Sequence, residues 1–145
     1  MAKTLQFEMT TPEKVALQAT AEFVVLPAFE GEMGILPNHA PFLVELVPGE
    51  VRVTQGAEVK RFAVSGGFAE VKDNKVSLFA ETAEMAEAID AERARQALER
   101  AKAEVVRKDL DPLQLMQAEA AIRRAAVRLK VGLRKHQPGN PHAQE

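Results

Sequence analysis

Three arginines give this sequence its clearest capacity for chemistry. Arg93 follows Asp90, a residue type favoured at helix N-caps, and Arg124 and Arg128 lie one helical turn apart in a later segment. In an antiparallel hairpin that turns near residues 109–110, Arg93 falls opposite residue 126, between Arg124 and Arg128. Three guanidiniums beside a helix N-terminus suit a phosphate group. The alternative is that these arginines solvate the hairpin or pair with Asp and Glu.

The other reactive residue types form no recognisable catalytic or metal site. Ser65, His39 and Asp73 would make a catalytic triad on paper, but the serine lacks the context of a nucleophile elbow. The two remaining histidines lie near the C-terminus without paired carboxylates, so they predict no metal. Gly66-Gly67 lacks the lysine and helix of a phosphate-binding loop and predicts a tight strand connection. We expect a protein that is not an enzyme.

The composition excludes further classes. With no cysteine among 145 residues, disulfides, thiol catalysis and cysteine-bound metals are ruled out. There is no apolar run near ~18 residues and no secretory signal, so we expect a protein of the cytoplasm or of a surface facing it. The chain has no Tyr or Trp, and its seven Phe all precede residue 80, which argues against nucleic-acid binding by the basic second half.

Charge and hydrophobic periodicity change at the same place. Residues 1–87 carry seven Lys and Arg against 13 Asp and Glu, a balance of −6, whereas residues 88–145 have a balance of +4. Up to about Ala80 apolar residues alternate with polar ones, as Leu5, Phe7 and Met9 do. Frequent turn residues punctuate these runs and predict many short strands. We therefore predict an antiparallel β-sandwich over residues 1–87.

A helical pattern follows from Ile89. Apolar residues recur at three- and four-residue steps until residues 108–112 interrupt them. There, Asp111 as N-cap and Pro112 as first helical residue predict a second helix, which runs to about Arg134. The short connection predicts an antiparallel α-helical hairpin over residues 88–135, and the proline-containing tail of residues 136–145 is predicted to be disordered. An alanine-rich seam buries little area, so the hairpin should lean on another surface.

Three motifs resemble the epsilon subunit of bacterial F-type ATP synthases. They are the stretch from Gly31 to Pro41 (Gly-Glu-Met-Gly-Ile-Leu-Pro-Asn-His-Ala-Pro), Leu46-Val47-Pro48-Gly49 and Val64-Ser65-Gly66-Gly67-Phe68. The order of a sandwich and a helical hairpin is similar too, and the resemblance covers about residues 3–133. It implies a non-catalytic rotor subunit of the central stalk, with the gamma subunit, the c-ring and the alpha and beta subunits as partners. Such a protein is peripheral to the cytoplasmic face of the bacterial inner membrane.

The resemblance also implies roles for particular residues. Glu32 matches a position that contacts the polar loops of the c-ring, and His39 matches one near gamma, although a plain loop explains this stretch as well. In some epsilon subunits an Ile-Asp-x-x-Arg-Ala motif binds ATP as a regulatory ligand. The matching residues here are Glu84, Ile89, Asp90, Arg93, Ala94, Arg124 and Arg128. No obligatory cofactor is expected.

The hairpin is expected to be a two-state element. Folded on the sandwich, it would permit rotation, and opened along gamma it would oppose ATP hydrolysis. Its basic residues would then meet acidic segments of the beta subunits; they are Arg123, Arg124, Arg128, Lys130 and Arg134. The alternative to the rotor is a free-standing β-sandwich adaptor whose hairpin binds a partner protein, and co-purification with gamma separates the two.

Overall fold

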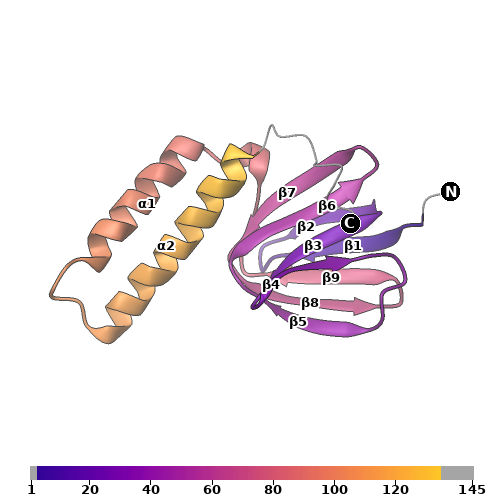
Figure 1. The fold of residues 1–145 in the computed structure, drawn as a ribbon, viewed down its shortest axis with the longest axis horizontal. Helices are drawn as coiled ribbons and strands as arrows, with labels where there is room; N and C mark the ends of the chain where they lie inside the picture. Colours follow the sequence, from indigo (N-terminus) through magenta and orange to yellow (C-terminus); the bar gives the residue numbers. More distant parts are fainter. Residues whose placement is uncertain (1–2, 135–145) are drawn as a thin grey trace.

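The computed structural model describes residues 3–134, so the tail predicted to be disordered, residues 136–145, lies outside the described residues. A two-layered β-sandwich is followed by two antiparallel helices (Figure 1). The predicted fold class is therefore confirmed. The second helix lies beside the sandwich and the first helix lies on its far side, away from the strands.

The described residues contain ten strands, and a 3₁₀ helix, η1, links the last of them to the helices. The bounds are β1 Leu5–Thr10, β2 Val15–Ala21, β3 Phe23–Ala28, β4 Gly31–Ile35, β5 Phe42–Leu46, β6 Gly49–Gln55, β7 Glu58–Val64, β8 Gly67–Lys72, β9 Lys75–Ala80, β10 Ala83–Met85 and η1 Ala86–Ala88.

The strands form one continuous sheet that folds over on itself. Their order is β10-β7-β6-β3-β5-β8-β9-β1-β2, with β4 paired to the other side of β3. The two layers meet where β3 and β5 share a single residue pair, Ala28 with Leu46. Every pairing is antiparallel except that of β1 with β9, which is parallel. No tight turn joins β1 to β9, so connection length does not impose the antiparallel direction on this pair.

The alternating residues of both layers meet in one core. The first strand shows the pattern, because Leu5, Phe7 and Met9 are each at most 2% exposed while Gln6 and Glu8 face outward. Val76, Leu78 and Ala80 are buried on one face of β9, as the sequence predicted. Burial on this scale, at about 25 cal/mol per Å² of apolar surface, is what holds the sandwich together.

Two turns depend on unusual backbone. Asp73 and Asn74 have positive φ values of 51° and 59° and join β8 to β9, which is the geometry that a two-residue hairpin turn requires. Gly67 has a φ of 134°, and a Cβ there would overlap the carbonyl oxygen of Phe79 on the neighbouring strand. Gly66-Gly67 is thus the tight strand connection that we predicted, and no helix begins there.

The segment from Glu30 to Pro41 differs from the loop that the sequence suggested. Its first half is strand β4, in which Ile35 pairs with Val24 and Gly31 with Ala28. Only residues 36–41 form an irregular turn. Glycines are more typical of loops than of strands, but Gly34 lies inside β4. A side chain would not fit there, because a Cβ at position 34 would lie 2.9 Å from the Phe23 ring.

The two helices begin where the sequence predicted. Helix α1 spans Ala91–Val105, and the Asp90 side chain accepts a hydrogen bond from the Arg93 backbone N–H. Helix α2 spans Pro112–Leu133, with Asp111 and Gln114 forming a reciprocal capping box. The periodicity of α2 predicts an apolar seam of Leu115, Ala118, Ile122, Ala125, Ala126, Leu129 and Val131. Five of these residues are buried or half-buried, but Leu115 and Ala126 are exposed, because α2 makes its contacts along the face that carries Ala118 and Ala125.

The hairpin docks on the sandwich through a small second core. Ala63 of β7 and Ala86 of η1 pack with Ile89, Ala94 and Val131. Close approach is possible because position 132 is glycine: a Cβ there would lie 2.7 Å from the Ile89 side chain. Helix α2 therefore rests directly on the connector between sandwich and helices.

Candidate functional site

The best-formed link between sandwich and hairpin is an ion pair between Glu84 and Arg128. Strand β10 places Glu84 opposite Ala63 at the edge of the sheet, next to α2. The Arg128 Nε donates to Glu84 Oε2 at 2.7 Å, and Nη2 donates to Oε1 at 3.2 Å. This two-point hydrogen bond raises the pKa of Arg128 above its ordinary value, and partial burial opposes the rise. It is the fork geometry that arginine makes best with a carboxylate.

The other two arginines of the expected phosphate site are not engaged. The side chains of Arg93 and Arg124 are exposed and make no hydrogen bond or ion pair within the described part of the chain. Ile89 and Ala94 are buried at 1% and 0% exposure and serve the packing of the hairpin. Asp90 caps α1. The structure thus brings Glu84 and Arg128 together, while Arg93 and Arg124 remain available to solvent.

This arrangement sets a condition for any phosphate ligand. A phosphate held by Arg93, Arg124 and Arg128 would have to share Arg128 with Glu84 or displace it. Such a site would set three arginines against one carboxylate of the sandwich, so the balance of charge would still favour an anion.

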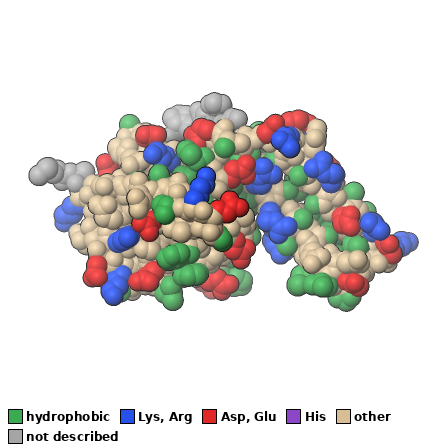
Figure 2. Space-filling model, turned by 180° about the vertical axis from the view of Figure 1, so that it is seen from behind, with side chains coloured by type: hydrophobic (Ala, Val, Ile, Leu, Met, Phe, Trp, Pro, Cys, Tyr) green, Lys and Arg blue, Asp and Glu red, His purple; other side chains and the backbone are tan. Residues whose placement is uncertain are grey.

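A second charged cluster lies where the end of α2 meets β6 and β4. Arg52 donates from Nη2 to Glu32 Oε2 at 2.8 Å and from Nη1 to Glu32 Oε1 at 2.9 Å. The same Nη1 donates to Glu50 Oε1 at 3.0 Å. Arg134, just beyond α2, lies 3.6 Å from Glu50 Oε1, and Arg61 lies 4.0 Å from it. Basic and acidic side chains adjoin at this junction in Figure 2.

Glu32 is held as an anion by this cluster. Its hydrogen bonds with Arg52 are the largest cause that lowers its pKa, partial burial opposes them, and the charges of Lys130 and Arg134 add to the lowering. Both carboxylates raise the pKa of Arg52 further above its already high value. Glu32, predicted to meet the c-ring, thus faces residues that were predicted to meet the beta subunits. Arg123 is exposed.

Glu50, Arg52 and Arg61 were missed at the sequence level. Glu50 and Arg52 alternate with buried Val51 and Val53, which is the pattern of solvent-facing positions in a strand. A signal was present: Arg52 lies directly opposite Arg61 in the β6–β7 pair. Like charges in that position repel unless a carboxylate lies between them.

His39 lies apart from Glu32, in the turn of residues 36–41. Its Nδ1 donates to the Ala40 carbonyl at 2.7 Å, and its ring meets Phe42 edge-on at a centroid distance of 6.3 Å. The turn is fixed by the Asn74 side chain, which accepts from the Asn38 backbone N–H at 2.8 Å. His39 is therefore beside β5 and the β8–β9 turn.

The outer face of β5, β8 and β9 exposes three large apolar side chains. Phe68 and Phe79 are a cross-strand pair with stacked rings whose centroids are 5.0 Å apart, and both are at least 40% exposed. Leu43, on the same face of β5, is 66% exposed. We call Leu43, Phe68 and Phe79 the apolar outer face. Figure 2 shows hydrophobic side chains gathered along the lower edge of the sandwich, where Figure 1 places β5.

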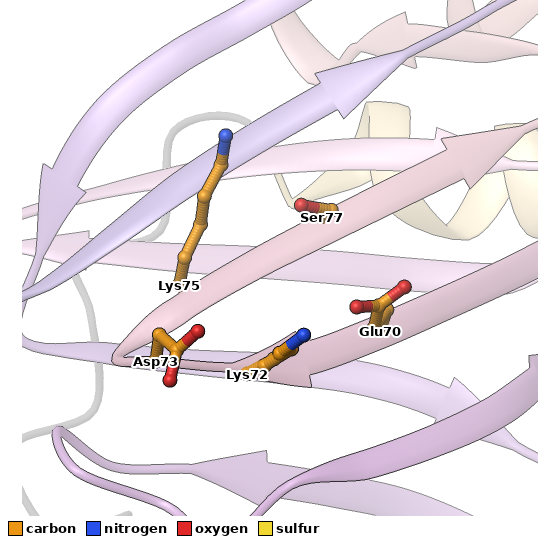
Figure 3. Close-up of a pocket in the computed structure, with 5 residues that line it drawn as sticks. All are labelled: Glu70, Lys72, Asp73, Lys75 and Ser77. Atoms are coloured by element: carbon orange, nitrogen blue, oxygen red, sulfur yellow. The ribbon is translucent and has the colours of Figure 1, made fainter.

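A polar hollow borders this face. It has a volume of about 260 Å³ and lies over β8 and β9, as Figure 3 shows. Its lining is Glu70, Lys72, Asp73, Lys75 and Ser77. Two cations and two anions balance each other there, so the hollow favours neither an anion nor a cation. It reads as the polar rim of the apolar outer face.

Within residues 3–134 no group of three or more metal-ligating side chains occurs. Over the same range, neither helix combines the length and the apolar character that crossing a membrane requires.

Comparison with protein families assigns both modules. Residues 4–86 match the model of the β-sandwich domain of the ATP synthase delta/epsilon chain, and residues 87–132 match the model of its long α-helix domain. The chain belongs to the ATP synthase delta/epsilon family. Members of its epsilon type are non-catalytic stalk subunits of the proton-translocating complex, so the expectation that the chain is not an enzyme is confirmed.

The curated relatives are epsilon chains. The ATP synthase epsilon chain of Desulforamulus reducens is 44% identical over 130 residues, which is 90% of this chain and 98% of the relative. The epsilon chain of Nitratidesulfovibrio vulgaris strain DP4 is 43% identical over 133 residues, or 90% of this chain and 97% of the relative. The suspected resemblance to the epsilon subunit is therefore confirmed.

Two solved structures that share this fold belong to subcomplexes of mitochondrial ATP synthases. A chain in the Euglena gracilis mitochondrial ATP synthase, in a structure of OSCP, F1 and c-ring, is 29% identical with a TM-score of 0.78. The match covers 92% of this chain and 82% of that one. A chain in the central stalk and c-ring of the Tetrahymena thermophila enzyme shares the fold at 19% identity and a TM-score of 0.60, over 91% of this chain and 99% of that one.

The Glu32–Arg52 pair predicts a pH dependence. Because the folded-state pKa of Glu32 lies below its ordinary value of 4.5, the pair stabilises the fold above that pH. The stabilisation disappears as pH falls through the lower, folded-state pKa. Over half of the Glu32 side chain is exposed, so we expect less than about 1 kcal/mol. Urea unfolding of the wild type and of Glu32→Gln should differ at neutral pH and converge in acid. An equal difference at both pH values would show that the pair contributes no charge-dependent stability.

Proposed function

We propose that this protein is a rotor subunit that couples the c-ring to the catalytic head and regulates ATP hydrolysis through its hairpin. The similarity to a chain of an ATP synthase that includes F1 and the c-ring carries this proposal. The sandwich would be the coupling module and the hairpin the regulatory one. The protein would lie at the cytoplasmic face of the bacterial inner membrane without entering it.

The apolar outer face is the proposed seat of the gamma subunit. Monomeric proteins seldom expose stacked aromatic rings together with a large aliphatic side chain, and such patches mark interfaces. Aromatic residues also supply most hot spots of protein interfaces. His39 contacts Phe42 at the start of β5, the strand that also carries Leu43, and would lie near gamma if gamma docks there. The polar hollow would supply the rim of the same interface.

Glu32 is the proposed contact with the polar loops of the c-ring. Its carboxylate is more than half exposed although Arg52 holds it, so a partner can reach it. The hairpin is proposed to open and to carry its basic residues to acidic segments of the beta subunits. Arg123 and Arg124 are already exposed in the docked form, whereas Arg128 and Arg134 must first leave Glu84 and Glu50.

ATP is the proposed regulatory ligand of the docked hairpin. Arg93, Arg124 and Arg128 would bind its phosphates, while Asp90 and Ile89 keep the start of α1 in place. Arg93 belongs to α1 and the other two arginines belong to α2, so all three could reach one phosphate chain only while the helices are packed together as in the docked hairpin. A ligand of the closed form shifts the population towards it by its differential affinity for the two forms.

The gamma contact can be tested by replacing Phe79 with serine. We expect Phe79→Ser to weaken co-purification of gamma at least about tenfold, the scale of losing one hot-spot aromatic. The reason is that partly exposed Phe79 contributes more to a partner than to the core. A pull-down with tagged protein from solubilised membranes measures this.

The matched control is Val106→Ser, which removes an apolar side chain that is 77% exposed at the far end of the hairpin. It should leave the yield of gamma unchanged. If Phe79→Ser recovers gamma as well as the control does, gamma does not dock on the apolar outer face. If even the wild type recovers neither gamma nor catalytic subunits, the rotor assignment itself fails.

The ATP proposal can be tested by titration calorimetry of the isolated chain. Arg93→Ala and Arg128→Ala should each weaken ATP binding by about 1.5–3 kcal/mol, the worth of a charge-assisted hydrogen bond. Arg95→Ala is the control, because Arg95 is an exposed arginine of the same helix that pairs with Glu92 instead. Absence of heat with wild-type protein at millimolar ATP would show that ATP is not a ligand, without touching the rotor assignment.

A further inference from the structure

Glu50 is the only buried charged or polar residue among residues 3–134. Its side chain is 4% exposed, and burial of a carboxylate is costly unless cations and donors surround it. Oε1 faces Arg52, Arg134 and Arg61, at 3.0, 3.6 and 4.0 Å. Oε2 accepts no hydrogen bond from any residue between 3 and 134. One oxygen is thus shared by three cations while the other is unsatisfied.

Arg52 divides its donors unequally between two carboxylates. Nη2 donates to Glu32, and Nη1 is shared between Glu32 and Glu50. As long as Glu32 holds Arg52 in this way, Arg52 cannot offer both nitrogens to Glu50. Glu50 therefore still needs Arg134, which belongs to the hairpin.

We infer that Glu32, Arg52, Glu50 and Arg134 form an ion relay through which a partner that binds Glu32 releases the end of the hairpin. A partner that takes the Glu32 carboxylate frees Arg52 to turn both nitrogens to Glu50 and to satisfy its Oε2. Glu50 then binds Arg134 less strongly. We call these four residues the ion relay.

A direct effect acts in the same direction. Lys130 and Arg134 are near enough to Glu32 for their charges to lower its pKa. When a partner neutralises Glu32, this attraction is lost, and Arg52 and Arg61 are left to repel the cations of α2. Rearrangement and charge balance therefore both weaken docking of the helix.

Linkage makes the coupling reciprocal. If binding at Glu32 favours the open hairpin by some factor, opening strengthens binding at Glu32 by the same factor. The identity of the partner, the polar loops of the c-ring, rests on the proposed function. The relay itself rests only on contacts within this chain.

The relay can be measured in the isolated full-length protein. The chain has no cysteine, so spin labels can be attached at Glu58→Cys on β7 and Gln96→Cys on α1. The distance between the two labels, measured by pulsed electron paramagnetic resonance, distinguishes docked from open hairpins. Glu32→Gln should raise the ratio of open to docked molecules on the order of fivefold, the lower end of usual coupling. Arg134→Gln should raise it too. The control is Glu30→Gln, an exposed acidic neighbour with no ion pair in the described structure.

The double variant decides whether the two sites are coupled. In the relay, Glu32→Gln has less effect once Arg134 is already replaced, so the double variant opens less than the product of the single effects. Independent, multiplicative effects would overturn the relay, as would a Glu32→Gln protein that behaves like Glu30→Gln. Circular dichroism of each variant confirms that the sandwich is intact.

Purified c-ring in detergent separates the relay from the identity of the partner. Addition of the ring to labelled wild type should increase the open fraction, and addition to Glu32→Gln should not. If the ring binds through Glu32 and leaves the open fraction unchanged, the relay is wrong. If the ring does not bind, the c-ring contact of the proposed function is wrong. The relay is then tested by the opening of the double variant compared with that of the single variants.

Discussion

The docked hairpin depends on one close approach, that of α2 to the connector at Ile89. Gly132 permits it, since any side chain at that position would collide with Ile89. The approach buries Val131 and brings Arg128 and Arg134 within reach of the acidic residues of the sandwich. Both ion pairs between the hairpin and the sandwich, Arg128 with Glu84 and Arg134 with Glu50, follow from it.

We expect the free energy that holds the hairpin on the sandwich to be small. The second core consists largely of alanines, which bury little area, whereas the sandwich buries Phe, Leu, Ile, Met and Val from both layers. The Glu84–Arg128 pair is about one-third exposed on both sides, and pairs of that kind contribute at most about 1 kcal/mol. A hairpin held so lightly can be shifted by one ligand or one partner. We therefore propose the division into a sandwich of residues 1–87 and a hairpin of residues 88–135.

Much of this fold could be predicted from the sequence, because helix caps and tight turns depend on residues close together in the chain. The caps at Asp90 and Asp111 and the turn at Asp73-Asn74 depend on residues at most a few positions apart. The strand at Gly31–Ile35 was not predicted, because its glycines are typical of loops. Its extended conformation depends on pairing with β3, which is distant information that the local sequence does not contain. The ion pairs of the two charged sites also depend on residues far apart in the sequence. No periodicity shows that Arg128 meets Glu84, or that α2 covers Glu50.

Native-state hydrogen exchange of the intact protein, followed residue by residue in rising denaturant, tests the central claim most directly. The account predicts that amides of α1 and α2 exchange together through an opening that costs less free energy than global unfolding. Amides of β1, β6, β7 and β9 should exchange only when the whole sandwich unfolds. A single free energy of exchange shared by helices and strands would contradict the account, because the hairpin would then be an inseparable part of one cooperative fold.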